Sequence, residues 1–90
     1  MNKHFEDTQY YLKRASETAK RGVTEELSPV QEKFRSITGR EEEPELSRID
    51  EIREELRKLQ DRAEGETREA IASARSRLDD YRSQRSEASD

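Results

Sequence analysis

Apolar and small residues recur every three or four positions along two long stretches of the chain. The first stripe runs from Phe5 to Ile37 and the second from Ile49 to Tyr81. Their average step of about 3.6 residues places each stripe on one face of an α-helix. Residues 39–45, which include Gly39 and Pro44, break the pattern between them. The sequence therefore predicts an all-α fold, an antiparallel hairpin of two helices each roughly 50 Å long.

Folding one stripe back onto the other places apolar residues opposite each other along its whole length. In this register Phe5 faces Tyr81, Leu27 faces Leu59 and Ile37 faces Ile49. The residues predicted to form the core and the seam between helices are Phe5, Leu12, Val23, Leu27, Val30, Phe34, Ile37, Ile49, Ile52, Leu56, Leu59, Ile71, Leu78 and Tyr81.

One hairpin domain is expected over residues 1–82, with arms at about 3–38 and 46–82 and a connecting loop at 39–45. Residues 83–90 are small and polar, so we expect a flexible tail there. Ser28 and Pro29 allow two interpretations. Read locally, they resemble a capping box with proline at the first helical position, which starts a new helix. The stripe, however, crosses them in phase, which favours a kink in one continuous arm.

Composition argues that one such hairpin needs a second copy. Of the 90 residues only 28% are hydrophobic while 44% are charged, and a lone pair of helices leaves its seam half exposed. Two hairpins that bury their seams together form a four-helix bundle, so we expect a homodimer. Residues 25–66 hold 8 basic and 14 acidic side chains, and the remaining open end holds 10 basic and 8 acidic. This polarity favours an antiparallel dimer.

Few residues offer chemistry. The absence of cysteine excludes disulfides, zinc thiolates and thiol catalysis. His4 is the single histidine, and paired carboxylates such as Glu54 and Glu55 lack the apolar pocket that would raise a pKa. We therefore expect no catalytic, cofactor or metal site, no small-molecule substrate and no enzyme. No apolar run approaches the roughly 18 residues of a membrane span and no secretory leader is evident, so a cytoplasmic protein is expected.

Two functional hypotheses remain. The first is a non-enzymatic, homo-oligomeric interaction or scaffold module with an unidentified protein partner. The second is a nucleic-acid-associated regulatory protein, in which the basic open end binds phosphates. Acidic residues interleave that basic set and weigh against it. The candidate phosphate-binding residues are Lys13, Arg14, Lys20, Arg21, Arg75, Arg77 and Arg82.

Three segments carry a family resemblance. They are HFEDTQYYLKRA at 4–15, TAKRGV at 18–23 and TGREEEP at 38–44. With them the chain resembles a family of short, functionally uncharacterised helical proteins from halophilic archaea, over residues 1 to about 82. The resemblance implies a helical fold in a cytosol of molar salt. It supplies no catalytic or binding residues.

Overall fold

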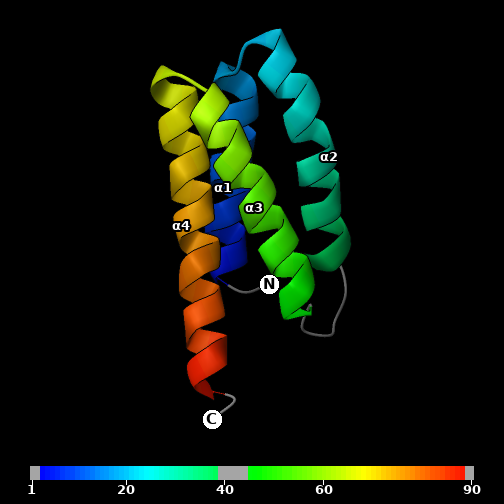
Figure 1. The fold of residues 1–90 in the computed structure, drawn as a ribbon, viewed down its shortest axis with the longest axis vertical. Helices are drawn as coiled ribbons and strands as arrows, with labels where there is room; N and C mark the ends of the chain where they lie inside the picture. Colours follow the sequence, from blue (N-terminus) through cyan, green and yellow to red (C-terminus); the bar gives the residue numbers. More distant parts are fainter. Residues whose placement is uncertain (1–2, 39–44, 89–90) are drawn as a thin grey trace.

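The computed structural model describes residues 3–38 and 45–88, and they form four α-helices. These are α1 (Lys3–Thr18), α2 (Arg21–Thr38), α3 (Leu46–Arg62) and α4 (Gly65–Ala88). Consecutive helices run in opposite directions, which gives an up-down-up-down bundle of about 40 × 21 × 20 Å (Figure 1). Among the described residues none is in a β-strand, so the predicted all-α class is confirmed. None of the described helices is long and apolar enough to cross a membrane.

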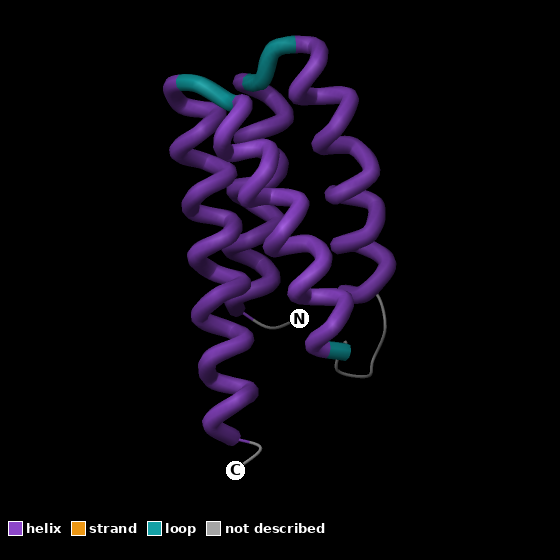
Figure 2. The backbone as a smooth tube through the Cα atoms, in the orientation of Figure 1, coloured by secondary structure: helices purple, strands orange, loops and turns teal. Residues whose placement is uncertain are grey.

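Each helix packs against two neighbours around a closed ring. Helix α1 packs on α2 and α4, and α3 packs on the same two helices, with α1 and α4 in the most extensive contact. The short α1–α2 and α3–α4 connections lie at one end of the bundle (Figure 2). The start of α1, the end of α2, the start of α3 and the end of α4 lie at the other end.

The prediction of two continuous arms is wrong, because each arm is broken near its middle. The first breaks at Ala19 and Lys20, and the second at Ala63 and Glu64. At the second break Ala63 is extended, with ψ of 159°, and Gly65 has a φ of +59°. Glycine is the residue that adopts this left-handed conformation without steric strain. The α1/α4 half of the hairpin thereby folds back onto the α2/α3 half.

Of the two interpretations of Ser28 and Pro29, a new helix beginning at Ser28 is wrong. Helix α2 continues through Pro29, and the hydroxyl of Ser28 donates a hydrogen bond to the carbonyl of Thr24 at 3.3 Å. The break lies earlier, at Ala19 and Lys20. At the other end of the chain α4 continues to Ala88, beyond the expected domain end at residue 82. Of the expected loop at 39–45, residues 39–44 lie outside the described residues.

The predicted pairing of the stripes is nevertheless visible in the contacts between helices. The rings of Phe5 and Tyr81 are 4.5 Å apart, and the hydroxyls of Thr18 and Thr67 are 2.9 Å apart, both between α1 and α4. Between α2 and α3, Lys33 binds Glu55. These pairs lie within two positions of the predicted register. The halves of the hairpin are therefore paired as expected, although the hairpin as a whole is folded.

The residues predicted to form the seam lie in the core of a single chain. All of them are buried except Val23, which is half-buried. The edge of one ring meets the face of the other between Phe5 and Phe34, at 5.6 Å, which joins the two halves of the bundle. Because one chain closes its own four-helix bundle, a second copy is not needed to cover the stripes. This removes the premise from which a dimer was expected.

Small side chains explain why α1 and α4 approach closely. Ala15 on α1 and Ala70 and Ala74 on α4 are all buried, and Thr8 and Thr67 are buried beside them. The Thr8 hydroxyl donates to the carbonyl of His4 at 2.7 Å, so its burial leaves no unpaired donor. Because these side chains are small, the backbones of α1 and α4 can lie close together.

Candidate functional site

The most ligand-sized depression of the described surface is a groove between α2 and α3. It has a volume of 430 Å³, and Pro29, Val30 and Leu59 contribute its apolar lining. Pockets of this size, mainly apolar with a few polar groups, are typical of binding sites. The surrounding surface is otherwise polar. Tyr10, 58% exposed, is the one large apolar side chain that is exposed among the described residues, and it does not line the groove.

Charged side chains border this apolar lining. Glu25, Glu26, Glu55, Lys58 and Arg62 complete the groove. An ion pair between Glu26 and Arg62 connects α2 with α3. The net charge of the five bordering side chains is negative, because three are acidic and two are basic.

Glu55 has a distinctive environment within the groove. Its Oε1 accepts a hydrogen bond of 2.7 Å from Nζ of Lys33, and this bond raises the pKa of the lysine above its usual range. Its other oxygen, Oε2, is buried and has no hydrogen-bond partner among the described residues. A buried acceptor without a donor is uncommon, because its desolvation is not compensated. Glu55 therefore offers unused acceptor capacity beside the apolar lining.

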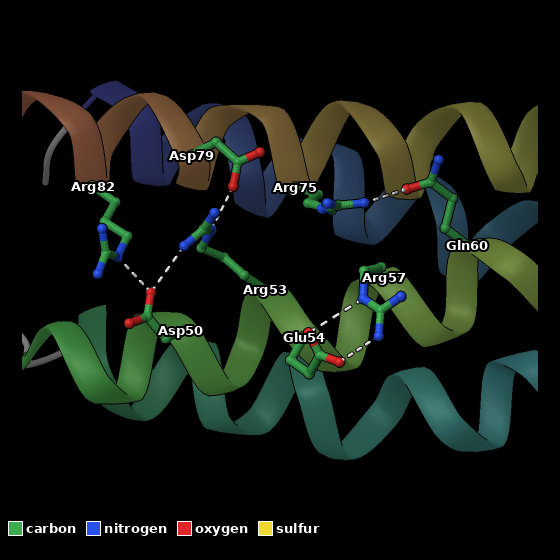
Figure 3. A network of polar contacts seen from close by, with 8 residues as sticks. All are labelled: Asp50, Arg53, Glu54, Arg57, Gln60, Arg75, Asp79 and Arg82. Atoms are coloured by element: carbon green, nitrogen blue, oxygen red, sulfur yellow. Dashed lines mark hydrogen bonds and ion pairs between the residues drawn. The ribbon is translucent and has the colours of Figure 1, made fainter.

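A second polar feature joins α3 to α4. Figure 3 shows Asp50 and Arg53 of α3 reaching Arg82 and Asp79 of α4. Asp50 Oδ1 accepts from Nε of Arg82 at 2.6 Å and from Nη1 of Arg53 at 2.9 Å, and Nε of Arg53 also donates to Asp79. We call these four residues the α3/α4 charge cluster. The cluster joins the acidic middle of the sequence to the basic end within one chain. The sequence had predicted such an attraction between two chains.

The cluster makes stability depend on pH. Burial alone raises the pKa of Asp50, but hydrogen bonds from Arg82 and Arg53 outweigh burial and lower it. A lowered pKa means that Asp50 stabilises the fold above its unfolded pKa of about 3.9, and that this contribution is lost as the pH falls through the folded pKa. Asp50→Asn is therefore expected to reduce the free energy of unfolding at pH 7 by about 1 kcal/mol, since the side chain is 41% exposed.

Urea unfolding of the wild type and of Asp50→Asn, each at neutral pH and at about pH 3, measures this effect. The difference between the two proteins should shrink at the lower pH, because the wild-type carboxylate loses its charge as the pH falls toward its lowered pKa. Asp61→Asn is the matched control, because Asp61 lies on the exposed side of the same helix. An equal loss for Asp50→Asn at both pH values would contradict the assignment.

The basic residues proposed for phosphate binding do not gather on one surface. Four of the seven have polar partners within the chain: Arg21 pairs with Glu25, Arg75 binds Gln60, Arg77 pairs with Asp7 and Asp80, and Arg82 binds Asp50. Lys13, Arg14 and Lys20 are exposed. Lys20 belongs to the α1–α2 connection at one end of the bundle, and Arg82 to the last turns of α4, which ends at the other (Figure 1). The candidate residues are therefore spread along the length of the bundle.

In residues 3–38 and 45–88, no three His, Asp or Glu side chains are grouped so that they could hold a metal ion. His4 is half-buried, lies 3.0 Å from Oε1 of Gln84 through Nε2, and has its ring near that of Tyr81. The histidine thus serves the α1/α4 contact, as a structural residue.

Sequence reasoning found the lining of the groove but not the groove itself. Val30 and Leu59 were predicted as seam residues, and Pro29 was considered only as a helix breaker. The sequence feature that indicates the site is Pro29, which lies on the exposed side of its helix, next to the apolar stripe and near Glu25 and Glu26. This feature indicates a groove only when α3 is known to lie opposite it.

Comparisons with known proteins supply a family but no activity. Neither the curated proteins nor the solved structures contain a match to the chain. A family model matches residues 1–84, which include all three segments that carry the resemblance noted from the sequence. That match names no ligand or partner, and nothing in it indicates halophilic archaea. The chain belongs to the DUF7553 family, a family of unknown function.

Proposed function

We propose that this protein is a non-enzymatic interaction module that binds a partner segment in the α2/α3 groove. The observation that carries the proposal is a depression of 430 Å³ that has an apolar lining within a charged border. Apolar side chains entering it would bury surface against Pro29, which is exposed above the buried Val30 and Leu59, and this burial favours association. The module needs no catalytic group for this role.

The chemistry of the border specifies the partner further. Three glutamates face two basic residues around the groove, and Oε2 of Glu55 lacks a donor. An amphipathic helix that presents aliphatic side chains together with a lysine or arginine complements both features. Its aliphatic face fits the lining, and its cation supplies hydrogen bonds to carboxylates. We therefore propose an amphipathic, basic helical segment as the ligand.

A display library of amphipathic peptides tests the proposal. The peptides share an aliphatic face, and the flanking positions vary among Lys, Glu and Gln. Selection on the folded protein should enrich lysine in the flanking positions. Pro29→Lys, a change at an exposed site that removes no core contact, should weaken the selected peptides by about tenfold or more, because it introduces a like charge at the groove.

Ser36→Lys provides the matched control, since it adds the same charge at an exposed position of α2 that does not line the groove. Glu55→Gln separates charge from shape, and it should weaken basic peptides while leaving the fold intact. Equal binding to Pro29→Lys and wild type, or selected peptides without basic residues, would refute a groove-directed function.

Nucleic-acid binding is the less supported function. Its candidate residues are spread along the bundle, and four of them bind acidic or amide side chains within the chain. Phosphate binding would have to displace these contacts. A labelled DNA duplex that bound tightly, with affinity falling steeply as salt rises, would overturn this ranking.

We further propose a cytoplasmic setting with high salt, as the resemblance implies. The absence of cysteine and the excess of 22 acidic over 18 basic side chains are compatible with it. Thermal unfolding in low and high KCl tests the salt requirement. A midpoint that rises with KCl supports the setting, and a midpoint that falls argues against it.

A further inference from the structure

The two breaks in the arms lie side by side at the same end of the bundle. Thr18, at the end of α1, and Thr67, in the first turn of α4, share a hydrogen bond of 2.9 Å across them. A cavity of 160 Å³ lies between the breaks, lined in part by Val23 and Ala63. We call residues 19–20 and 63–64 the two joints. Together they form a double hinge between the α1/α4 half and the α2/α3 half.

Both apolar stripes cross the joints without changing phase. The first continues from Ala15 through Ala19 to Val23, and the second from Leu59 through Ala63 to Thr67. If the arm could only be broken at the joint, the stripe of the second helix would not need to continue the 3.6-residue period of the first. The sequence is therefore compatible with a bent arm and with a straight helical arm. Straightening both joints leaves the α1–α4 and α2–α3 pairings intact.

Straightening separates only the contacts between the halves. These are the α3–α4 contact, with the charge cluster, and the α1–α2 contact, with the rings of Phe5 and Phe34. A half that separates in this way exposes its apolar stripe. The surface that can cover this stripe is the other half of a second copy. Because the surfaces are the same, two straight hairpins arranged antiparallel rebuild every such contact between chains.

We propose that two copies of this chain exchange halves through the double hinge, so that the partner's α2/α3 half packs on this chain's α1/α4 half. The partner is a second copy of this chain, because the core and charge contacts are the same in the single chain and in the exchanged dimer. Short connections between elements that could run on as one are the usual setting of domain swapping. The swapped dimer holds two four-helix bundles, and its α2/α3 grooves are unchanged. Failure of groove binding and failure of exchange are therefore separate results.

Gly65 provides the sharpest test of the hinge. Its φ is +59°, and a Cβ added there meets no atom within 4 Å, so alanine acts through the backbone alone. Gly65→Ala disfavours the bent joint, which needs a left-handed residue, and favours a straight helix. Summed over two chains, the association constant of the dimer should rise about 100- to 1,000-fold. Light scattering at a series of protein concentrations measures it.

Gly22→Ala is the matched control, because Gly22 also has free space around it and lies inside α2. It should stabilise the helix without increasing the dimer. Exchange itself is shown by mixing a Gly65→Ala chain carrying Arg53→Cys with one carrying Asp79→Cys. A short bis-maleimide crosslinker should link the two chains, since Arg53 and Asp79 meet across the interface between halves.

Arg21→Pro gives the opposite result at the other joint. Position 21 is the first residue of α2, where proline is tolerated, whereas proline inside a straight arm breaks it. Wild type refolded at high protein concentration should contain dimer, and Arg21→Pro should remain monomeric. A wild type that stays monomeric after this refolding, or a Gly65→Ala dimer in which the crosslinker joins no Arg53→Cys chain to an Asp79→Cys chain, overturns the proposal. The first criterion holds even if Gly65→Ala fails to fold.

Discussion

Leu56→Asp is expected to unfold the whole chain at room temperature. Leu56 lies in the middle of α3 and is fully buried. Its replacement removes a leucine from the core, at a cost of about 2–5 kcal/mol, and places a carboxylate where water does not reach, which costs several more. A domain of this length is stable by roughly 5–13 kcal/mol in total. The remaining stability is therefore near zero or negative.

Far-UV circular dichroism and sizing chromatography measure the result. The variant should lose most of its helical signal and elute as an expanded monomer. Ser47→Asp, at an exposed position near the start of the same helix, should keep the fold, since an acidic side chain is favourable there. If Leu56→Asp stayed helical and changed only its oligomeric state, the stripe would be an interface between chains and not the core of one.

Phe34→Ala is expected to lower the free energy of unfolding by about 3–5 kcal/mol. Phe34 is the largest of the fully buried side chains, and its ring meets Phe5, whose ring in turn contacts Tyr81. This aromatic row connects α2 through α1 to α4. Removing its end leaves a cavity at the contact between the two halves of the bundle, and the edge-to-face contact is lost as well.

Urea unfolding followed by circular dichroism measures the loss for Phe34→Ala. Phe34→Leu keeps more of the volume and should cost clearly less, so the pair separates cavity formation from a general effect at the site. Val23→Ala is a second comparison, because Val23 is only half-buried. Similar losses for Phe34→Ala and Val23→Ala would show that the aromatic row is not a principal contact.

The periodicity of the sequence was enough to predict the all-α class, the buried face of each arm and the pairing of residues that places α1 beside α4 and α2 beside α3. Phe5 opposite Tyr81 is the clearest case, because the rings meet as the register requires. Periodicity reports which face of a helix is buried, and it does so whatever covers that face. It therefore could not distinguish a stripe covered by a second chain from one covered by the other half of the same chain.

The positions of the breaks were missed for a related reason. Pro29 was the strongest local breaker in the first arm, yet α2 accommodates it. The first arm bends instead at Ala19 and Lys20, where no residue is a strong breaker. Gly65 carried the signal for the second break, but an isolated glycine in a helical pattern is usually tolerated. The arms bend because bending lets one chain bury both of its stripes, and this is a tertiary effect.

The candidate site was only partly visible from the sequence. The apolar residues of the groove belong to the stripes, but its shape depends on how α2 and α3 lie against each other. The charge cluster was not predicted, because the attraction between an acidic middle and a basic end was expected between two chains and not within one. Asp50 and Arg82 are 32 positions apart, and only the folding of the hairpin brings them together.

The most direct test of the central claim, that one chain closes its own four-helix bundle, is absolute mass by light scattering on a sizing column. Samples are diluted in series at about 0.15 M and about 2 M KCl, and circular dichroism is recorded on each. The account predicts a helical monomer of 10.6 kDa that persists on dilution at both salt concentrations. A dimer of twice that mass that never dissociates on dilution, or a diluted monomer without helix, would contradict it.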